Sequence, residues 1–100
     1  MTTSIQETDT RITATLSGEL DTAAAQETEK ALMPLLNSQG KEIYIDCTSL
    51  EYISSSGLRV LLSILKQAKS VGSRVVLKNV NEVIRDVLDL TGFVNIFEFA

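Results

Sequence analysis

Hydrophobic and polar residues alternate near the start of the chain in a way that predicts a β-hairpin. Residues 3–7 and 11–17 are separated by a short polar turn, and in the second segment every other residue is apolar. A period of two is typical of a half-buried strand. Residues 18–20 break this alternation. We expect Asp21 or Thr22 to cap a following helix, because a side-chain oxygen there accepts from the free N–H groups of the first turn.

The rest of the chain is expected to form three helices, each followed by a strand. Pro34 lacks an N–H and clashes with the preceding turn, so the first helix should loosen near Met33 and end within residues 37–40. Its apolar stripe comprises Ala24, Thr28, Leu32 and Leu35. The strands that follow the helices are expected at residues 41–47, 75–77 and 95–99.

The second and third helices show the clearest period of 3.6 residues. The second is expected to begin at the serine cluster 54–56 and to stop at Gly72. The third should begin at Asn81 and end at Gly92, where glycine suits a C-terminal cap. The residues expected to face the core are Leu58, Leu61, Leu62, Leu65 and Ala68 in the second helix and Val83, Ile84, Val87 and Leu88 in the third.

The expected order of elements is therefore β-β-α-β-α-β-α-β. Strands that alternate with helices indicate an α/β fold with a mostly parallel sheet, and here an amino-terminal antiparallel hairpin precedes them. Helices would pack on the sheet. The chain of 100 residues has the commonest size of a single domain, so we expect one domain over residues 1–100.

Charge and hydropathy exclude several classes of partner. The formal net charge is −4, and the nine basic residues are scattered. Nucleic-acid binding relies on clustered Lys and Arg, so we expect no nucleic-acid partner. Residues 1–20 have neither a basic leader nor a sustained apolar run, and no segment approaches the roughly 20 apolar residues of a membrane span. We therefore expect a cytoplasmic protein without membrane insertion.

The residues that usually carry catalysis are scarce. The chain has no histidine, which makes a Ser-His-Asp triad impossible and removes the commonest metal ligand. Cys47 lies inside an expected strand without an imidazole to activate it, so we expect a buried structural thiol. Neither of the Gly-rich phosphate-binding patterns occurs. We expect no enzyme activity, no cofactor and no bound metal.

Three consecutive serines, Ser54 to Ser56, lie between an expected strand and the second helix. One interpretation is structural, because serine caps helices and favours turns. Another is that one hydroxyl is a phosphorylation site, since the free N–H groups and the positive dipole end of a helix start stabilise a phosphate. Both interpretations can hold at once, and the pattern by itself leaves them open.

The sequence resembles the STAS domains, and among them the bacterial anti-sigma factor antagonists. The most specific match runs from Ile45 to Leu58 and is similar to the family's strand, short hydrophobic turn and Ser-Ser-Gly-Leu segment. The other matching segments are Gly18-Glu19-Leu20-Asp21, Arg74 to Asn79, Val83 to Leu90 and Gly92-Phe93.

The resemblance implies a regulatory protein whose serine directly before Gly-Leu, Ser56, is phosphorylated. The implied partners are an anti-sigma factor that is also a serine kinase, which the unphosphorylated antagonist binds, and a serine phosphatase that resets the antagonist. Residues implied to surround the phosphosite and to contact the partner are Asp21, Thr22, Asp46, Ser54, Ser55, Gly57, Leu58 and Arg59.

Two positions depart from the family pattern. Ser54 stands where the family usually has aspartate, and Asp46-Cys47-Thr48 replaces Asp-Leu-Ser. The first departure removes an acidic neighbour of the phosphosite, although Asp21 and Asp46 are expected near the same corner. A non-phosphorylated STAS adaptor, such as a subunit of a lipid-transport complex, is therefore an alternative. A small enzyme or ligand-binding domain is a third reading that the missing histidine disfavours.

Overall fold

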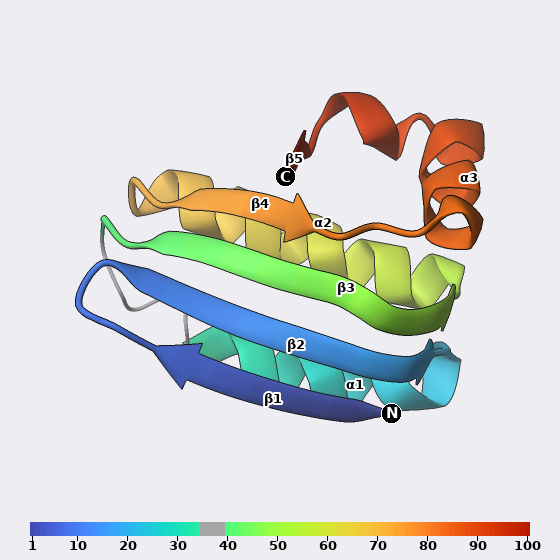
Figure 1. Ribbon diagram of the computed structural model, residues 1–100, viewed down its shortest axis with the longest axis horizontal. Helices are drawn as coiled ribbons and strands as arrows, with labels where there is room; N and C mark the ends of the chain where they lie inside the picture. Colours follow the sequence, from blue (N-terminus) through green and yellow to red (C-terminus); the bar gives the residue numbers. More distant parts are fainter. Residues whose placement is uncertain (35–39) are drawn as a thin grey trace.

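The strands form one sheet in which the spatial order equals the order along the chain (Figure 1). The computed structural model describes residues 1–34 and 40–100. β1 pairs with β2 antiparallel, and the remaining neighbours pair parallel. The expected hairpin and the mostly parallel α/β sheet are therefore confirmed. The strands are β1 (Thr2–Glu7), β2 (Arg11–Leu20), β3 (Glu42–Ile53), β4 (Arg74–Lys78) and β5 (Glu98–Phe99).

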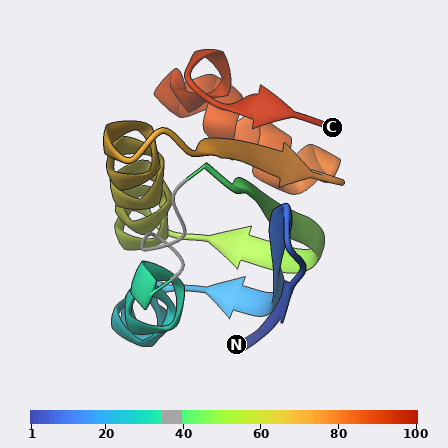
Figure 2. The ribbon, with the colours of Figure 1, turned by 90° about the vertical axis from the view of Figure 1, so that its left-hand side faces the viewer.

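Helices α1 (Thr22–Leu32) and α2 (Ser55–Ser70) lie side by side on one face of the sheet (Figure 2). The alternation in β2 and in the first half of β3 directs one set of side chains toward these helices. Helix α3 (Glu82–Thr91) and a short 3₁₀ helix, η2 (Phe93–Asn95), follow β4. The core lies between the sheet and helices α1 and α2. Its buried side chains include Ile12, Ala14 and Leu16 of β2, Ile43, Ile45 and Cys47 of β3, and Leu58, Leu61 and Leu65 of α2.

Strand β3 is longer than expected, and β2 continues through residues 18–20 instead of breaking there. The register explains both errors. Arg11 pairs with Glu42 and Leu20 with Ile53, so ten residues of β2 face twelve of β3, and the two extra residues of β3 form irregularities after Thr15 and after Gly18. A bulge interrupts the two-residue alternation without ending the strand. From Cys47 onward every third residue of β3 is buried, a pattern that the expected alternation excluded.

The first helix ends at Leu32, where the expected loosening near Met33 is confirmed. The N–H of Met33 still donates to Glu29 O, and α1 goes no further. The buried stripe comprises Ala25, Thr28 and Leu32, whereas Ala24 is only half-buried. The expected position Leu35, and most of the expected helix end at 37–40, lie outside the described residues.

The carboxyl-terminal part of the chain differs from expectation in two places. Val83 was expected to face the core but is 59% exposed, because Ile84 and Leu88 occupy the buried side of α3 and Val83 points away from them. The expected strand over 95–99 is shortened to β5, because the N–H groups of Asn95 and Ile96 donate to the preceding turn of η2 instead of to a strand. Gly92 ends α3 in the left-handed region, as expected.

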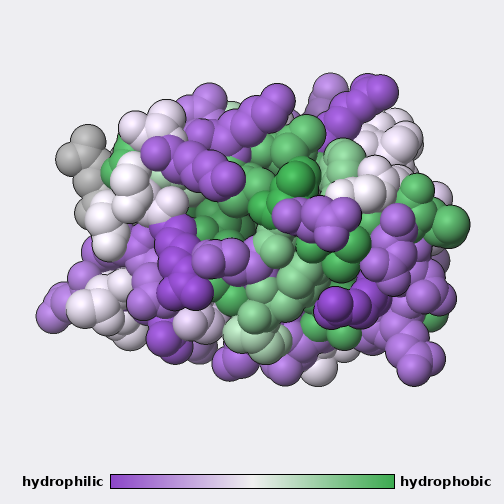
Figure 3. Space-filling model, turned by 90° about the horizontal axis from the view of Figure 1, so that it is seen from above, coloured by the Kyte–Doolittle hydropathy of each residue, from purple (hydrophilic) through white to green (hydrophobic). Residues whose placement is uncertain are grey.

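The surface on the side of α3, η2 and β5 is shown in Figure 3, where apolar surface lies in the middle of the view with polar side chains around it. Val83, Leu90 and Ile96 are among the exposed large hydrophobic side chains of this region. Within the described residues, no helix has both the length and the apolar character needed to cross a membrane.

Asn81 ties the start of α3 to the long end of β3. Its Oδ1 accepts from the Ile84 N–H at 3.0 Å, and its Nδ2 donates to Leu50 O at 2.7 Å. We expect Asn81→Ala to lower the free energy of unfolding by about 1–3 kcal/mol, because it removes both a cap and a tertiary hydrogen bond. Urea unfolding would measure this. Asn81→Ser keeps a capping oxygen but loses the bond to Leu50 O, so it should cost less than Asn81→Ala. Equal losses for both variants would contradict a contribution from the cap, and no loss for Asn81→Ser would contradict one from the bond to Leu50.

Candidate functional site

The site is a corner where two parallel strands end side by side and two helices begin. Leu20 at the end of β2 is in register with Ile53 at the end of β3. Each strand is followed by a capping residue: Asp21 Oδ1 accepts from Ala24 N–H at 2.8 Å at the start of α1, and Ser54 caps α2. Because carboxyl ends of parallel strands share one edge of a sheet, the two helix N-termini lie next to each other.

Ser54 joins the two halves of this corner. Its hydroxyl accepts from Gly57 N–H at 3.1 Å and donates to Leu20 O at 3.2 Å, while its own N–H donates to Leu20 O at 2.9 Å. The hydroxyl thus has both a donor and an acceptor partner inside the protein. The structural interpretation of the serine cluster therefore holds for Ser54.

Gly57 is required by close packing. A Cβ at Gly57 would lie 2.7 Å from Leu20 Cγ, 2.8 Å from Leu20 O and 2.9 Å from Ile53 Cγ1. Contacts this short do not occur, so the first turn of α2 can approach the ends of β2 and β3 only with glycine here. Leu58 follows and is 5% exposed in the core. Gly57 and Leu58 therefore support the corner from beneath and offer little contact surface.

Ser55 and Ser56 occupy the outer side of the same turn. Ser55 is exposed and Ser56 is half-buried. The Ser56 hydroxyl makes no hydrogen bond within the described part of the chain, and neither do the N–H groups of Ser55 and Ser56, which are the first two donors of α2. Such N–H groups have no partner inside a helix. Ser56 is thus the serine with a free, partly sheltered hydroxyl.

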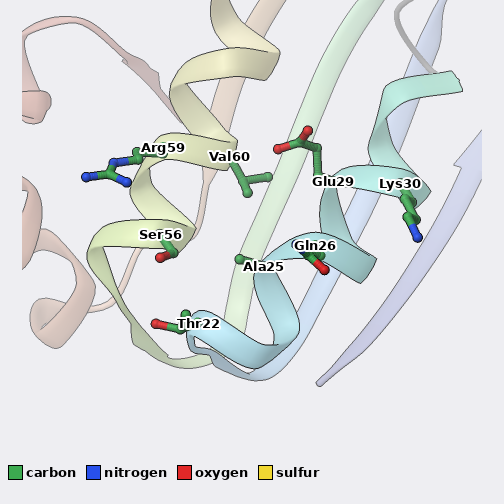
Figure 4. A pocket seen from close by; sticks show the side chains of 8 residues that line it. All are labelled: Thr22, Ala25, Gln26, Glu29, Lys30, Ser56, Arg59 and Val60. Atoms are coloured by element: carbon green, nitrogen blue, oxygen red, sulfur yellow. The ribbon is translucent and has the colours of Figure 1, made fainter.

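A groove of about 560 Å³ runs between α1 and α2 and reaches Ser56 (Figure 4). Thr22 and Ser56 lie at the same end of the two helices, and Arg59 follows one turn along α2 with its guanidinium directed away from α1. The groove walls are amphipathic, with apolar side chains at the base and charged ones at the rim. The lining residues are Thr22, Ala25, Gln26, Glu29, Lys30, Ser56, Arg59 and Val60.

An acidic hollow lies on the other side of α1. It is lined in part by Glu19, Asp21, Glu27 and Glu51. Three of these carboxylates come from the ends of β2 and β3 and from the cap of α1, and the fourth comes from α1 itself, so the fold brings together acids that are far apart in sequence. None of the residues that line the hollow has a basic side chain. Four of the thirteen acidic side chains of the protein thus line one hollow beside the corner.

Asp46 is not brought to this corner, contrary to expectation. Asp46 lies seven positions before Ile53 in β3, which is about 20 Å along a strand. Asp46 Oδ1 accepts from the Thr48 hydroxyl at 2.6 Å and from the Thr48 N–H at 3.0 Å. These bonds, with help from Asn79 and Lys78, lower the pKa of Asp46 although partial burial opposes them. Its role is local to the middle of β3.

Cys47 is the buried thiol that the sequence predicts. It is 1% exposed, and its Sγ donates to Ile45 O. Burial, together with the negative charge of Asp46, raises the pKa of the thiol to about 12, so it stays protonated at neutral pH. No group of three or more potential metal-ligating side chains is found in the described ranges.

The arrangement matches a known domain. The family model of the STAS domain matches residues 2–100. The chain belongs to the STAS family. This confirms the resemblance inferred from the segment between Ile45 and Leu58 and from the shorter matches around it.

Curated relatives of this STAS domain carry regulatory names. One relative is BtrV of Bordetella bronchiseptica, whose name describes it as an anti-sigma factor antagonist. It is 34% identical to this chain over 92 residues, which span 92% of this chain and 79% of BtrV. The anti-sigma-B factor antagonist of Bacillus subtilis is 27% identical over 96 residues, or 96% of this chain and 87% of that protein. These names describe regulatory binding proteins, not enzymes.

Solved structures agree in fold. A Thermotoga maritima protein described as an anti-sigma factor antagonist superposes with a TM-score of 0.88 at 26% identity, over 97% of this STAS domain and 84% of that chain. SpoIIAA in its unphosphorylated form superposes with a TM-score of 0.83 at 21% identity, over 99% of this domain and 88% of that chain. The phosphorylated form of SpoIIAA from Bacillus superposes with a TM-score of 0.74 at 20% identity, over 99% of this domain and 91% of that chain.

The sequence did not reveal the α1 side of the groove or the acidic hollow. Gln26, Glu29 and Lys30 read as ordinary solvent-facing residues of a helix. Only the packing of α1 beside α2 places them opposite Ser56 and Arg59. The one available signal is that Glu19 lies two residues before the cap Asp21 in the Gly18-Glu19-Leu20-Asp21 segment.

Replacing Gly57 by alanine tests the close packing. Alanine normally stabilises a helix by about 1 kcal/mol relative to glycine. Here we expect Gly57→Ala to lower the free energy of unfolding by about 1–3 kcal/mol, because the methyl group meets Leu20 and Ile53. Urea unfolding would measure the change, with Ser55→Ala as a control in the same turn. A stabilised Gly57→Ala protein would contradict the packing argument.

The carboxylate of Asp46 should contribute to the dependence of stability on pH. Its pKa in the folded protein lies below the unfolded value, so the folded state favours the ionised form. The contribution is present above the unfolded pKa of about 3.9 and is lost as the pH falls through the folded value. We expect Asp46→Asn to be less stable than the parent at pH 7 and closer to it at pH 3, measured by urea unfolding. A constant difference across this range would contradict the argument.

Proposed function

We propose that this STAS domain is an anti-sigma factor antagonist whose partner is an anti-sigma factor with serine kinase activity, and that phosphorylation of Ser56 controls their binding. The observation that carries the proposal is the division of roles among three serines. Ser54 is engaged as a cap, Ser55 stands outside the groove, and Ser56 lines the groove with an unengaged hydroxyl. The names of the relatives support the class of partner.

The proposed modification is an ordinary phosphoryl transfer. The Ser56 Oγ attacks the γ-phosphorus of ATP held by the kinase, the bond from that phosphorus to the oxygen of the departing ADP breaks, and the hydroxyl proton passes to a base on the kinase. This STAS domain supplies the nucleophile alone. A phosphatase reverses the change by hydrolysing the phosphoserine to serine and inorganic phosphate.

The folded domain can carry this phosphate without unfolding. Ser56 is the second residue of α2, where the unengaged N–H groups and the positive end of the helix dipole favour an anion. The first turn of α2 contains no acidic residue that would repel it. Phosphorylation therefore changes the surface while the core beneath Gly57 and Leu58 stays as it is.

A bound partner would respond strongly to the same phosphate. The phosphate adds about −1.5 to −2 charges at neutral pH to a protein whose formal charge is −4. A partner packed over Ser56 would have to accommodate a hydrated dianion in place of a hydroxyl. Each 1.4 kcal/mol that this costs weakens binding about tenfold, so a single phosphate suffices to release the partner.

Charge also restricts what kind of surface the partner presents. The acidic hollow borders the corner through Asp21, while the groove rim carries both signs of charge. A partner surface with basic residues beside its active site would complement the hollow and would approach Ser56 from that side. Ser54 is compatible with this role despite replacing the family's aspartate, because it caps α2 as an aspartate would.

The decisive test is phosphorylation by the serine-kinase anti-sigma factor encoded in the same genome. After incubation with ATP, mass spectrometry should find phosphate on Ser56, and Ser56→Ala should abolish it. The phosphorylated protein should bind the kinase at least about tenfold more weakly than the unmodified protein in calorimetry, because the phosphate occupies the contact surface.

Two matched variants control this experiment. Ser55→Ala alters an exposed neighbour in the same turn and should be phosphorylated like the parent. Ser54→Ala should lose about 1 kcal/mol of stability through the lost cap and still accept phosphate on Ser56. Phosphate on Ser55, or a kinase that neither binds nor modifies the chain, would sink the proposal and favour the non-phosphorylated adaptor.

A further inference from the structure

Arg59 lies close enough to Ser56 on α2 to form an ion pair with a phosphate on that residue. The two residues are three apart on α2, so their side chains leave neighbouring turns on one side of the helix with Cβ atoms about 5–6 Å apart. Both line the same groove, and the guanidinium of Arg59 extends away from α1 (Figure 4). At this spacing an arginine side chain is long enough to reach a phosphate on Ser56 by rotation about its own bonds, with no movement of the backbone.

Arg59 has no competing partner in the described part of the chain. The ion pairs found there join Lys41 to Glu7 and Arg74 to Glu98, and the ring contacts of arginine involve Arg11 and Arg85. Arg59 is exposed and belongs to neither set. In the unphosphorylated protein it is thus a cation available to solvent or to a partner at the rim of the groove.

Charged groups around the groove favour Arg59 as the counter-ion over its neighbours. Glu29 and Lys30 reach the groove from α1, across from Ser56, and the Asp21 carboxylate is engaged by the Ala24 N–H. Lys30 is a full two turns along α1 from Thr22, the residue that marks the Ser56 end of the groove. Arg59 is on the phosphate's own helix, and its planar guanidinium can donate two parallel hydrogen bonds to phosphate oxygens.

We propose, resting on the proposed function, that Arg59 is the internal counter-ion of phosphorylated Ser56. Its guanidinium turns onto the phosphate and, with the first N–H groups of α2, holds it against the domain. Phosphorylation then changes the partner-facing surface in two ways at once. It adds an anion at Ser56 and withdraws the exposed cation of Arg59 from contact with the partner.

The test uses protein in which phosphoserine is incorporated at position 56 during translation, so no kinase is needed. Phosphorus NMR gives the second pKa of the phosphate, which is about 6 for an isolated phosphoserine. We expect Arg59→Gln to raise this pKa by about half a unit or more, because removal of an adjacent cation disfavours the dianion. Arg59→Lys should give an intermediate pKa, since lysine keeps the positive charge but lacks the planar guanidinium that donates two parallel hydrogen bonds.

Lys66→Gln is the matched control. Lys66 is an exposed cation on the same helix, ten residues or about 15 Å beyond Ser56, so its loss changes the net charge equally without touching the phosphate. It should leave the phosphate pKa unchanged. Equal shifts for Arg59→Gln and Lys66→Gln, or no shift for either, would overturn the counter-ion assignment.

The outcome is separable from that of the proposed function. A pKa shift specific to Arg59→Gln supports the counter-ion even if no kinase modifies Ser56, in which case the proposed function fails. Kinase modification of Ser56 without such a shift retains the proposed function and removes Arg59 from it. Circular dichroism of each variant confirms that the fold is intact, as expected for an exposed side chain.

Discussion

The structure depends on the close approach of helix α2 to the ends of β2 and β3. Gly57 leaves no room for a side chain against Leu20 and Ile53, and Ser54 binds Leu20 O through both its N–H and its hydroxyl. These contacts fix where α2 starts and at what height above the sheet. Because α1 begins directly after Leu20, the same contacts set the two helix N-termini beside each other. The groove and the position of Ser56 follow from this one constraint.

A rigid corner suits a switch that works by changing partners. Ser54 holds the backbone through its hydrogen bonds, and the buried Gly57 and Leu58 hold it through packing. Ser55, Ser56 and Arg59 are exposed or half-buried on the outer side of the same segment. Chemistry on the outer side therefore need not disturb the core. Unfolding α2 to signal would cost the burial of its whole apolar face, whereas a phosphate alters charge and shape at the surface for a small change in stability.

The two departures from the family pattern have different consequences in the structure. Ser54 takes over the capping that an aspartate would perform, so the architecture of the corner is retained while one negative charge is absent from it. Cys47, in the second departure, fills a core position where its thiol is kept protonated by burial. Negative charge near the corner comes instead from Glu19, Asp21 and other acids of the hollow, which the chain assembles from several elements.

The sequence by itself determined the α/β class, the hairpin, the three helix starts and the position of the serine segment, residues 54–56, at the start of the second helix. These depend on local signals: alternation in β2, the caps Asp21, Ser54 and Asn81, and the apolar stripe of α2. Local signals failed where the pairing partner decides the outcome. The length of β3 depends on bulges against β2, and the shortness of β5 depends on hydrogen bonds within η2.

Tertiary structure alone decided which serine is available and what surrounds it. Hydroxyls in a row are equivalent in sequence, and their difference arises because Leu20, 34 residues before Ser54, supplies the acceptor that engages Ser54. Likewise Asp46, which lies nearer to Ser56 in sequence than Thr22 does, is carried away from it by the extended strand, and Thr22 is brought to it by parallel pairing. Residues close in sequence lie far apart when an extended strand runs between them. Residues far apart in sequence come together when a helical connection brings the chain back to the same edge of the sheet.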